Sequence, residues 1–306
     1  MRLSGQNRIE GDLRGAIIAL GNFDGFHKGH QVVAQTAIDW ARVEQRPVII
    51  ATFDPHPVRH FQPDAAPFRL TTLDQREHLF TQAGADAMLV FEFGAELAGT
   101  SAEDFVEELL VNRFGAAGIV TGEDFTFGKG RAGNVALMTE LGAPLGLRTK
   151  AVGPVSDSVE TISSSRIRAA LQAGDCETAT QLLTRPFAIS GPVIHGDKNG
   201  RKLGYPTANI DIGQYLRPRY GIYAVKGRLP DGRVVKGAAN LGIRPTFDPP
   251  KELLEPYFFD FAEDLYGQVI EVELHHFLRG EAKFDDLDSL MVQMAKDCAE
   301  AKERLA

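Results

Sequence analysis

The chain has 306 residues, of which 43% are hydrophobic and 24% are charged, as is usual for a globular protein long enough for two domains. Its 33 Lys and Arg residues against 41 Asp and Glu residues give a net charge of −8. That charge argues against a general attraction to nucleic acid or to an anionic membrane. Any phosphate group must therefore be bound by a local site.

The two cysteines and the amino terminus indicate the compartment. Cys176 and Cys298 lie far apart and show no metal-ligand spacing. The first residues lack the apolar core of a signal peptide, and no stretch approaches the roughly 18 apolar residues of a spanning helix. We therefore expect a protein of the reducing cytoplasm, without a membrane segment.

From residue 16 to about residue 183, short β-branched runs alternate with segments of helical period. This alternation is typical of an α/β fold with a parallel sheet and crossover helices. Strands are expected at residues 16–20, 47–53, 87–91, 118–121 and 148–152. Helices are expected at residues 30–45, 73–83 and 101–114, the last opened by a capping box of Ser101 and Asp104.

After residue 185 glycines and prolines become frequent, and the apolar runs are typical of strands. Strands are expected at residues 220–229, 234–243, 255–261 and 269–278, with Asp231-Gly232 as a hairpin turn between the first two. Residues 287–305 have helical period. The sequence thus predicts domains at residues 1–185 and 186–306, the second a small antiparallel β-barrel with a terminal helix.

The turn after the first expected strand reads GNFDGFHKGH, residues 21–30. Its glycines let the backbone pass close to a ligand, and the helix start behind them suits an anion. His27 and His30 can face the same way and donate hydrogen bonds to phosphate oxygens. The short H-x-G-H pattern fits a plain surface turn equally well. The full string resembles the nucleotidyltransferase superfamily, in which the paired histidines stabilise the phosphorus undergoing substitution.

Three further segments resemble the flavin adenylyltransferase domain of bacterial riboflavin kinase/FAD synthetases: ATFDPHP, VTGEDFTFGKGRAGN and ISSSRIRAAL. They follow the second, fourth and fifth strands, at the edge where such sheets bind ligands. Taken singly, each also reads as a rigid turn, a core aromatic or a polar helix cap. The resemblance and the chemistry of the side chains together imply ATP-binding residues Gly21, Asn22, Phe23, Asp24, Gly25, Ser164, Ser165 and Arg168, and flavin-binding residues Phe53, Asp54, Pro55, Asp124, Phe125 and Phe127.

Two glycine-rich patterns are typical of phosphate-binding loops in other proteins, G-x-G-x-x-G and G-x-x-x-x-G-K-[ST]. GKGRAG, residues 128–133, matches G-x-G-x-x-G, but it lies several residues beyond its strand and has no acidic residue at the required spacing. We therefore expect a mobile loop there and no dinucleotide site. The chain also lacks G-x-x-x-x-G-K-[ST], which excludes a Walker-type ATPase.

The second half resembles riboflavin kinase through GPVIHGDKNGRKLGYPTANI, AANLGIRPTF, LLEPYFFDFAEDLYG and FLRGEAKF. In PTAN, Thr207 and Asn209 offer hard oxygen ligands to Mg²⁺ in an ATP complex, although PTAN alone also fits a simple turn. The preceding Gly-rich segment, with Gly196 and Lys202, suits the phosphates of ATP. The resemblance places the carboxylate that activates the substrate hydroxyl at Glu255. Its rivals are Glu252 and Glu281.

The sequence therefore predicts a two-site enzyme that uses Mg²⁺. One site phosphorylates riboflavin with ATP to give FMN, and the other transfers an adenylyl group from ATP to FMN, giving FAD and pyrophosphate. The expected partners are the small molecules riboflavin, FMN and ATP. Two alternatives stay open at this point: only one site is active, or the protein is a non-catalytic flavin or nucleotide sensor. The sequence also leaves open whether the chain forms a homo-oligomer.

Overall fold

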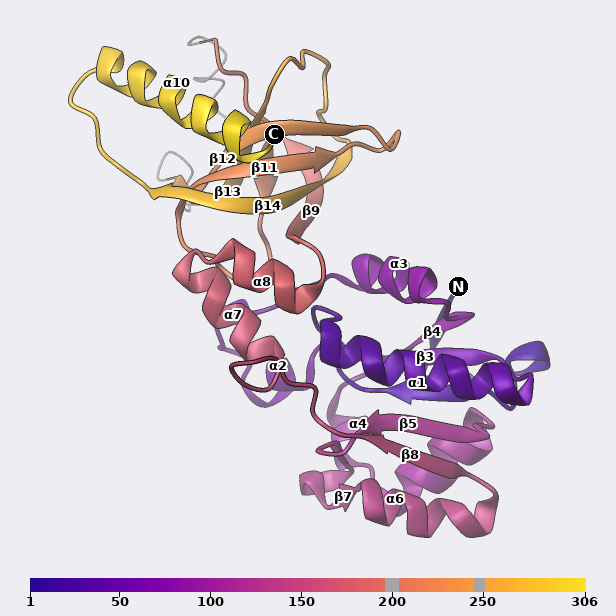
Figure 1. Ribbon diagram of the computed structural model, residues 1–306. Helices are drawn as coiled ribbons and strands as arrows, with labels where there is room; N and C mark the ends of the chain where they lie inside the picture. Colours follow the sequence, from indigo (N-terminus) through magenta and orange to yellow (C-terminus); the bar gives the residue numbers. More distant parts are fainter. Residues whose placement is uncertain (196–203, 245–250) are drawn as a thin grey trace. The chain divides into compact units, whose positions relative to one another are not determined.

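A computed structural model of the chain describes residues 1–195, 204–244 and 251–306 (Figure 1). It divides into two compact units, Met1–Ala66 with Leu73–Ser163, and Pro67–Thr72 with Ser164–Ala306. The segment Pro67–Thr72 belongs to the second unit because the backbone of Arg69 forms hydrogen bonds with the backbone of Gln214 and of Leu216. Helices α7 (Ser164–Ala173) and α8 (Cys176–Leu183) also belong to the second unit. The two units are defined by contacts between residues. The domain limits 1–185 and 186–306 stay a prediction.

The first unit contains a six-stranded parallel sheet in the order β1-β4-β3-β2-β5-β8. All five expected strands are present, which confirms the α/β class. The edge strand β1 was not expected, because three residues carry no readable alternation. The strands are β1 (Arg2–Ser4), β2 (Ile17–Leu20), β3 (Val48–Asp54), β4 (Ala87–Glu92), β5 (Gly118–Gly122) and β8 (Arg148–Val152).

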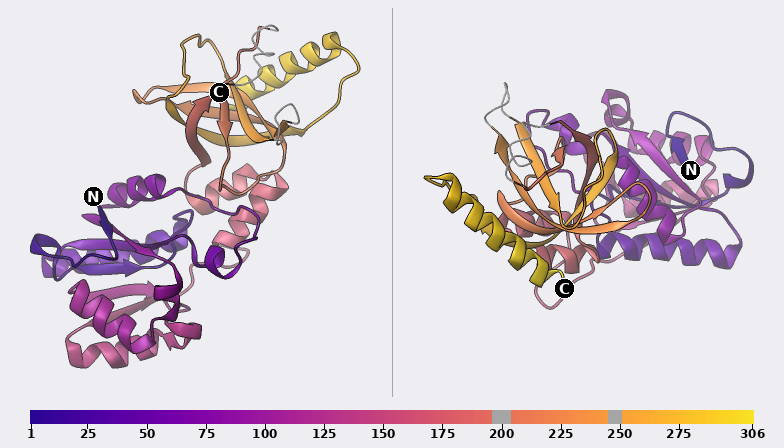
Figure 2. Two further views of the ribbon diagram at one scale, coloured as in Figure 1. Left: turned by 180° about the vertical axis from the view of Figure 1, so that it is seen from behind. Right: turned by 90° about the horizontal axis from the view of Figure 1, so that it is seen from above.

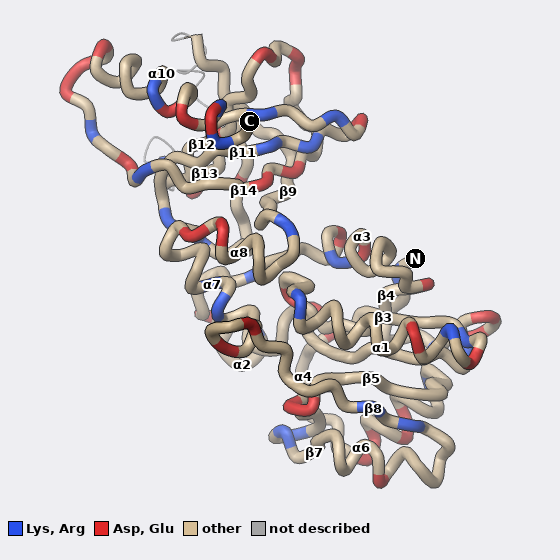
Figure 3. Tube along the Cα trace, viewed as in Figure 1, with Lys and Arg blue, Asp and Glu red and all other residues tan. Residues whose placement is uncertain are grey.

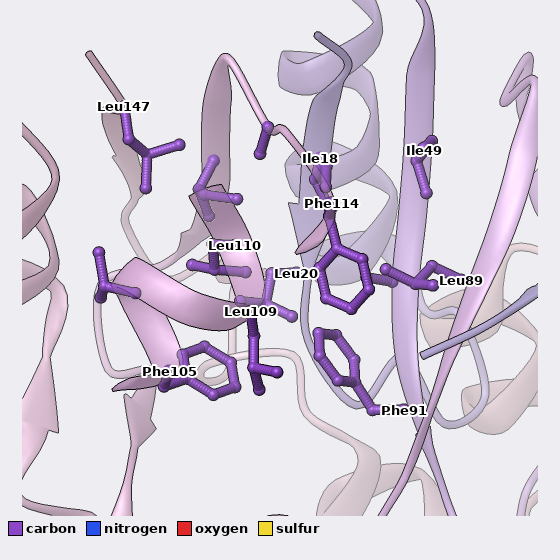
Figure 4. Packing of buried hydrophobic residues seen from close by; sticks show 14 of the residues in the cluster. Ile18, Leu20, Ile49, Leu89, Phe91, Phe105, Leu109, Leu110, Phe114 and Leu147 are labelled. Carbon is purple, nitrogen blue, oxygen red and sulfur yellow. The ribbon is translucent and has the colours of Figure 1, made fainter. Parts of the chain in front are cut away.

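Both faces of this sheet are buried, which explains the continuous apolar runs. Ile17 and Ala19 face α1 (Lys28–Glu44) and α3 (Leu73–Ala83), whereas Ile18 and Leu20 face the opposite layer. Figure 4 shows that opposite layer, where side chains of the π-helical segment η2 (Phe105–Arg113) pack on the sheet. The helix α6 (Val135–Gly142) completes this layer.

Short elements connect these layers. The expected amino-terminal cap at Ser101 is confirmed, since its Oγ accepts a hydrogen bond from the Asp104 N–H at 2.9 Å. The remaining elements of this unit are η1 (Gly11–Leu13), α2 (Pro57–Phe61), α4 (Ala95–Gly99), α5 (Ala102–Asp104), β6 (Thr126–Phe127), η3 (Lys129–Arg131), β7 (Gly133–Asn134) and η4 (Ala143–Leu145).

The second unit is built on a closed antiparallel barrel in the order β10-β13-β12-β11-β14-β9. The helix α10 (Leu287–Arg304) lies along the outside of the barrel (Figure 2). The barrel and the terminal helix confirm the prediction, whereas β9 and β10 were not expected. The strands are β9 (Phe187–Ile194), β10 (Asn209–Asp211), β11 (Gly221–Arg228), β12 (Val234–Arg244), β13 (Lys251–Phe258) and β14 (Val269–Gly280).

Alternation along the strands separates the interior of the barrel from its outer face. The Phe258 ring of β13 occupies the space where a side chain at Gly227 of β11 would lie. β13 and β11 are two strands apart in the barrel, so the two residues can meet only in its interior. Ala224 and Ala238 face outward and pack under α10. The predicted turn is confirmed, since Gly232 has a φ of 87° and the N–H of Leu229 bonds to the carbonyl of Arg233 at 2.9 Å.

Charged residues of both signs are interspersed along the Cα trace in both units (Figure 3). No helix within residues 1–195, 204–244 and 251–306 is long and apolar enough to cross a membrane.

Candidate functional sites

The loop from β2 to α1 is held in an unusual backbone conformation. Phe23, Gly25 and Phe26 all have left-handed φ values, of 49°, 85° and 42°. Such values are costly for residues with a Cβ and persist where the surroundings enforce them. Burial holds the loop in this conformation, because the rings of Phe23 and Phe26 both pack against Phe80 of α3. The ring centroids are 5.7 and 5.0 Å from that of Phe80. The loop is therefore preorganised.

His27 and His30 lie together at the start of α1. His27 is the amino-terminal cap, is 5% exposed, and accepts a hydrogen bond at Nδ1 from the His30 N–H at 3.4 Å. The two rings stack with centroids 3.6 Å apart. Gly29 makes this possible, because a Cβ there would lie 3.2 Å from the His27 ring. With Nδ1 as acceptor, neutral His27 carries its proton on Nε2 and is a donor there.

A buried arginine supports this loop from beneath. Arg76 of α3 is 2% exposed and donates from Nη1 to Thr52 Oγ1 at 2.7 Å, while Thr52 donates to the carbonyl of Asn22 at 2.7 Å. Its Nη2 lies 3.8 Å from Asp54 Oδ1. The sequence analysis missed Arg76, because an arginine in an amphipathic helix usually faces solvent. The available signal was its place four residues before Phe80, on the buried side of α3.

The residues after β3 divide into core and surface aromatics. Phe53 is buried and stacks on Phe91, so it lies in the core of the sheet. Asp54 and Pro55 follow, joined by a cis peptide bond. The exposed ring at this edge is Phe61, 65% exposed, which contacts Phe93 with centroids 5.8 Å apart. The sequence analysis did not single out this surface pair.

The segment after β5 forms a small hairpin of β6 and β7. Asp124 is exposed at its base, and Phe125 is partly buried and stacks on Phe127. Phe127 is itself buried against Phe105 of η2. The GKGRAG stretch runs from the end of β6 into β7 and contains η3, and α6 begins two residues after it.

Ser164, Ser165 and Arg168 lie in the first turns of α7, in the second compact unit. Arg168 donates from Nε to the carbonyl of Phe68 at 2.9 Å, and its guanidinium lies 5.3 Å from the centre of the Phe68 ring. This contact fixes the direction of the arginine side chain. The serine hydroxyls stand at a helix start, where anions are favoured.

In the barrel, Asn209 and Glu255 lie side by side on neighbouring strands. β10 and β13 pair with Ile210 opposite Leu254, which sets Asn209 level with Glu255. Ala238 packs under α10 on the outer face and stands opposite Tyr257, so Glu255, two residues before Tyr257, also faces outward. Asn209, level with Glu255, shares this face and is 6% exposed. Thr207 precedes β10 and is partly buried. Two other predicted residues, Gly196 and Lys202, lie outside the described residues.

The three candidate carboxylates have different partners. Glu255 Oε2 accepts a hydrogen bond from Nε of Arg244 and forms an ion pair with its Nη2, and Glu281 lies 3.6 Å from the same guanidinium. Glu252 is bound by Arg217 at 2.6 Å and by the Tyr220 hydroxyl. The hydrogen bonds from Arg217 and from Tyr220 lower the pKa of Glu252. Burial and this contact raise the pKa of Tyr220 to about 12.

A pocket of about 320 Å³ opens between β13 and α10. Tyr257 lies in its wall two residues after Glu255, and so on the same face of β13. Burial raises the pKa of the Cys298 thiol in the opposite wall to about 11, which keeps it neutral. The sequence analysis missed this pocket. Its lining residues are Tyr205, Tyr257, Phe259, Asp260, Ala295, Cys298, Ala299 and Lys302.

The donor atoms near Glu255 fit a magnesium ion. Thr207 and Asn209 carry neutral oxygens, and Mg²⁺ takes a few oxygen ligands from a protein together with water and phosphate. Within the described parts of the chain, no group of three or more His, Cys, Asp or Glu side chains forms a metal cluster.

Comparison with known proteins gives two family matches that together cover most of the chain. The family model described as FAD synthetase matches residues 9–166, and that described as riboflavin kinase matches residues 183–305. A protein of Haemophilus influenzae named bifunctional riboflavin kinase/FMN adenylyltransferase is 38% identical over 98% of this chain and 96% of its own length. Proteins of the same name from Escherichia coli K12 and Bacillus subtilis are 36% and 37% identical, over 97% and 94% of this chain and 95% and 91% of their own lengths.

Among solved structures, one from Streptococcus pneumoniae is similar over 97% of both chains, with a TM-score of 0.85 and 29% identity. It is titled as a macrolide-efflux protein. The likeness supports the pairing of a parallel-sheet unit with a barrel in one chain.

Proposed function

Because this chain belongs to the family of bifunctional riboflavin kinases/FMN adenylyltransferases, we propose that it makes FMN from riboflavin and ATP, and then FAD and pyrophosphate from FMN and ATP. The observation that carries the proposal is that one chain holds both constellations: the stacked pair His27 and His30, and the pair Asn209 and Glu255 on adjacent strands. The partners are then riboflavin, FMN and ATP.

In the adenylyl transfer, the chain supplies position and charge, with no covalent intermediate. His27 and His30 donate hydrogen bonds to the phosphate oxygens of ATP at the start of α1, where the helix dipole favours the same anion. The backbone of Gly21, Asn22, Phe23, Asp24 and Gly25 forms the floor under the nucleotide. Ser164, Ser165 and Arg168 bind the β- and γ-phosphates, which leave as pyrophosphate.

The flavin of this first site lies at the ends of β3 and β5. Phe61 and Phe93 offer an exposed aromatic surface to the ring, together with Phe125. Phe53 and Phe127 act from the core, as the packing behind these rings. Asp54, Pro55 and Asp124 frame the edge of the site with their polar and rigid groups.

In the phosphorylation, Glu255 orients the terminal ribityl hydroxyl and accepts its proton, since an alcohol is a weak nucleophile. Thr207 and Asn209 would hold the metal of a metal–ATP complex, and Gly196 and Lys202 are the residues proposed for its phosphates. The isoalloxazine ring occupies the pocket beside Tyr257. Bound Mg²⁺ would offset the negative charge of the transferring phosphoryl group.

We also propose that the protein works in the cytoplasm. Cys176 and Cys298 are both free thiols, as expected in a reducing compartment.

The test is incubation of the purified protein with riboflavin, ATP and MgCl₂, followed by chromatography of the flavins. FMN is expected to appear first and FAD to follow, and EDTA should stop both steps. FMN without FAD, under conditions where added FMN is also not converted, would support the single-site alternative. Flavin binding with neither product would refute the enzyme proposal in favour of a sensor.

A further inference from the structure

A line of polar side chains crosses three neighbouring strands on the outer face of the barrel. Glu255 of β13 stands opposite Asn240 of β12, and Asn209 of β10 flanks Glu255 on its other side. Opposed residues of an antiparallel pair have Cβ atoms about 4.5–5.5 Å apart and point the same way. Asn240 is therefore an immediate neighbour of Glu255, although no motif discussed above assigns it a role.

The carboxamide of Asn240 is unusual for its position. Its Oδ1 is buried and has no hydrogen-bond partner within the described parts of the chain. A buried acceptor without a donor costs free energy, and few are found in native structures. The residue as a whole is partly exposed, and the terminal torsion of asparagine is soft. A turn of the carboxamide can therefore present its oxygen to a ligand on the outer face.

The neighbours of Asn240 on this face have small side chains or none. Along β12 they are Ala238 and Gly242, and a side chain at Gly242 would run into the carboxylate of Glu281. Ala238 stands opposite Tyr257, which lines the pocket proposed for the flavin ring. Asn240 is thus two residues, or about 7 Å, along the strand from the pocket, and level with Glu255.

We propose that the Asn240 carboxamide oxygen accepts a hydrogen bond from a ribityl hydroxyl adjacent to the one that is phosphorylated. This inference rests on the proposed kinase function, which puts the ring near Tyr257 and the reacting hydroxyl at Glu255. The polyol between them then passes Asn240. The residue therefore makes the site selective for flavins that carry a polyol, and it also holds the chain in register with Glu255.

The test compares riboflavin with lumiflavin, a flavin that lacks the polyol. The KM for riboflavin and the inhibition constant of lumiflavin are both measured in FMN formation, so that only the kinase site is reported. In Asn240→Ala, the KM for riboflavin should rise about two- to tenfold, as expected for one lost hydrogen bond, while the lumiflavin constant changes less than about twofold. Asn240→Ser keeps a shorter acceptor and should fall between wild type and Asn240→Ala.

Both constants refer to active molecules, so partial unfolding of a variant leaves their ratio intact. FAD formation from added FMN should be unchanged and serves as the internal control. An equal rise of both constants, or no rise in either variant, overturns the role of Asn240. If the wild-type protein forms no FMN, the proposed function itself has failed, and the two failures are thereby distinguished.

Discussion

Arg244 holds the carboxylate of Glu255 from one side, through both Nε and Nη2, while its Nη1 lies 3.6 Å from Glu281. A guanidinium fixes both the direction and the negative charge of a carboxylate. In phosphoryl transfer through a loose transition state, orienting the attacking hydroxyl matters more than removing its proton early. A carboxylate fixed by Arg244 is suited to that orienting role.

The first prediction therefore concerns Glu255. Glu255→Gln keeps the size of the side chain but removes the charge that orients the hydroxyl, so kcat for FMN formation should fall about 10²- to 10⁴-fold. Steady-state rates followed by chromatography measure the loss. The rate of FAD formation from FMN should stay within twofold of wild type, because the two reactions are proposed to use separate sites.

Glu281→Gln is the matched control, since Glu281 shares Arg244 but is not level with Asn209. It should retain FMN formation within about tenfold of wild type. A larger loss in Glu281→Gln than in Glu255→Gln would contradict the assignment and move the orienting role to Glu281.

The second prediction concerns the stacked histidines. His27→Asn and His30→Asn each replace the imidazole by a shorter side chain whose donor should no longer reach the proposed phosphate position, so the rate of FAD formation should fall about 10²- to 10³-fold. FMN formation from riboflavin should be retained in both variants. His78→Asn, an exposed position in α3 of the same unit, is the control and should leave both rates unchanged. Loss of FMN formation in His27→Asn would contradict independent sites.

The third prediction concerns Arg76, which ties Thr52 and the β2–α1 loop together. Arg76→Met removes the buried hydrogen bond to Thr52 Oγ1 and the charge near Asp54, and the free energy of unfolding of the first unit should fall by about 2–4 kcal/mol. Trp40, the chain's one tryptophan, lies in this unit and reports its unfolding in urea by fluorescence. FAD formation should fall as well, because the loop is no longer preorganised.

Arg42→Met provides the comparison for Arg76→Met. Arg42 lies on the exposed side of α1, with a surface ion pair to Asp39, and its loss should cost less than about 1 kcal/mol. Equal effects of the two substitutions would show that Arg76 contributes no more than a surface charge.

Much of the fold could be predicted because burial leaves a mark on the sequence. Strands buried on both faces, such as β3, read as unbroken apolar runs, and the Asp231-Gly232 turn reads as a hairpin. The histidine pair could be predicted for a different reason. His27 and His30 are close in sequence and belong to one Gly-rich string at the end of a strand.

The remainder depends on residues that meet only in space. β1 and β10 are three residues long each, and their pairing with β4 and β13 carries no local pattern. The link from Arg76 to Thr52 spans 24 residues, and the pocket beside Tyr257 lies between β13 and α10. Asn240 became significant only through its register opposite Glu255.

The last prediction concerns acid stability of the barrel and rests on Glu252. Its bonds to Arg217 and to Tyr220 lower its pKa in the folded state, so the folded protein binds its proton less readily than the unfolded chain does. This contribution is fully present above the unfolded pKa of about 4.3 and is lost as the pH falls through the lower, folded pKa. Glu252→Gln should therefore reduce the free energy of unfolding by about 1 kcal/mol at pH 7 and by clearly less near pH 3.

Urea unfolding followed by far-ultraviolet circular dichroism at the two pH values measures this difference, with Trp40 fluorescence identifying the transition of the other unit. Glu263→Gln is the control, because Glu263 pairs with Arg233 on the exposed surface and should change the stability little at either pH. A stability loss in Glu252→Gln that is the same at pH 7 and pH 3 would mean that the carboxylate acts through packing alone. A smaller loss at pH 3 ties it to the charge that Arg217 binds.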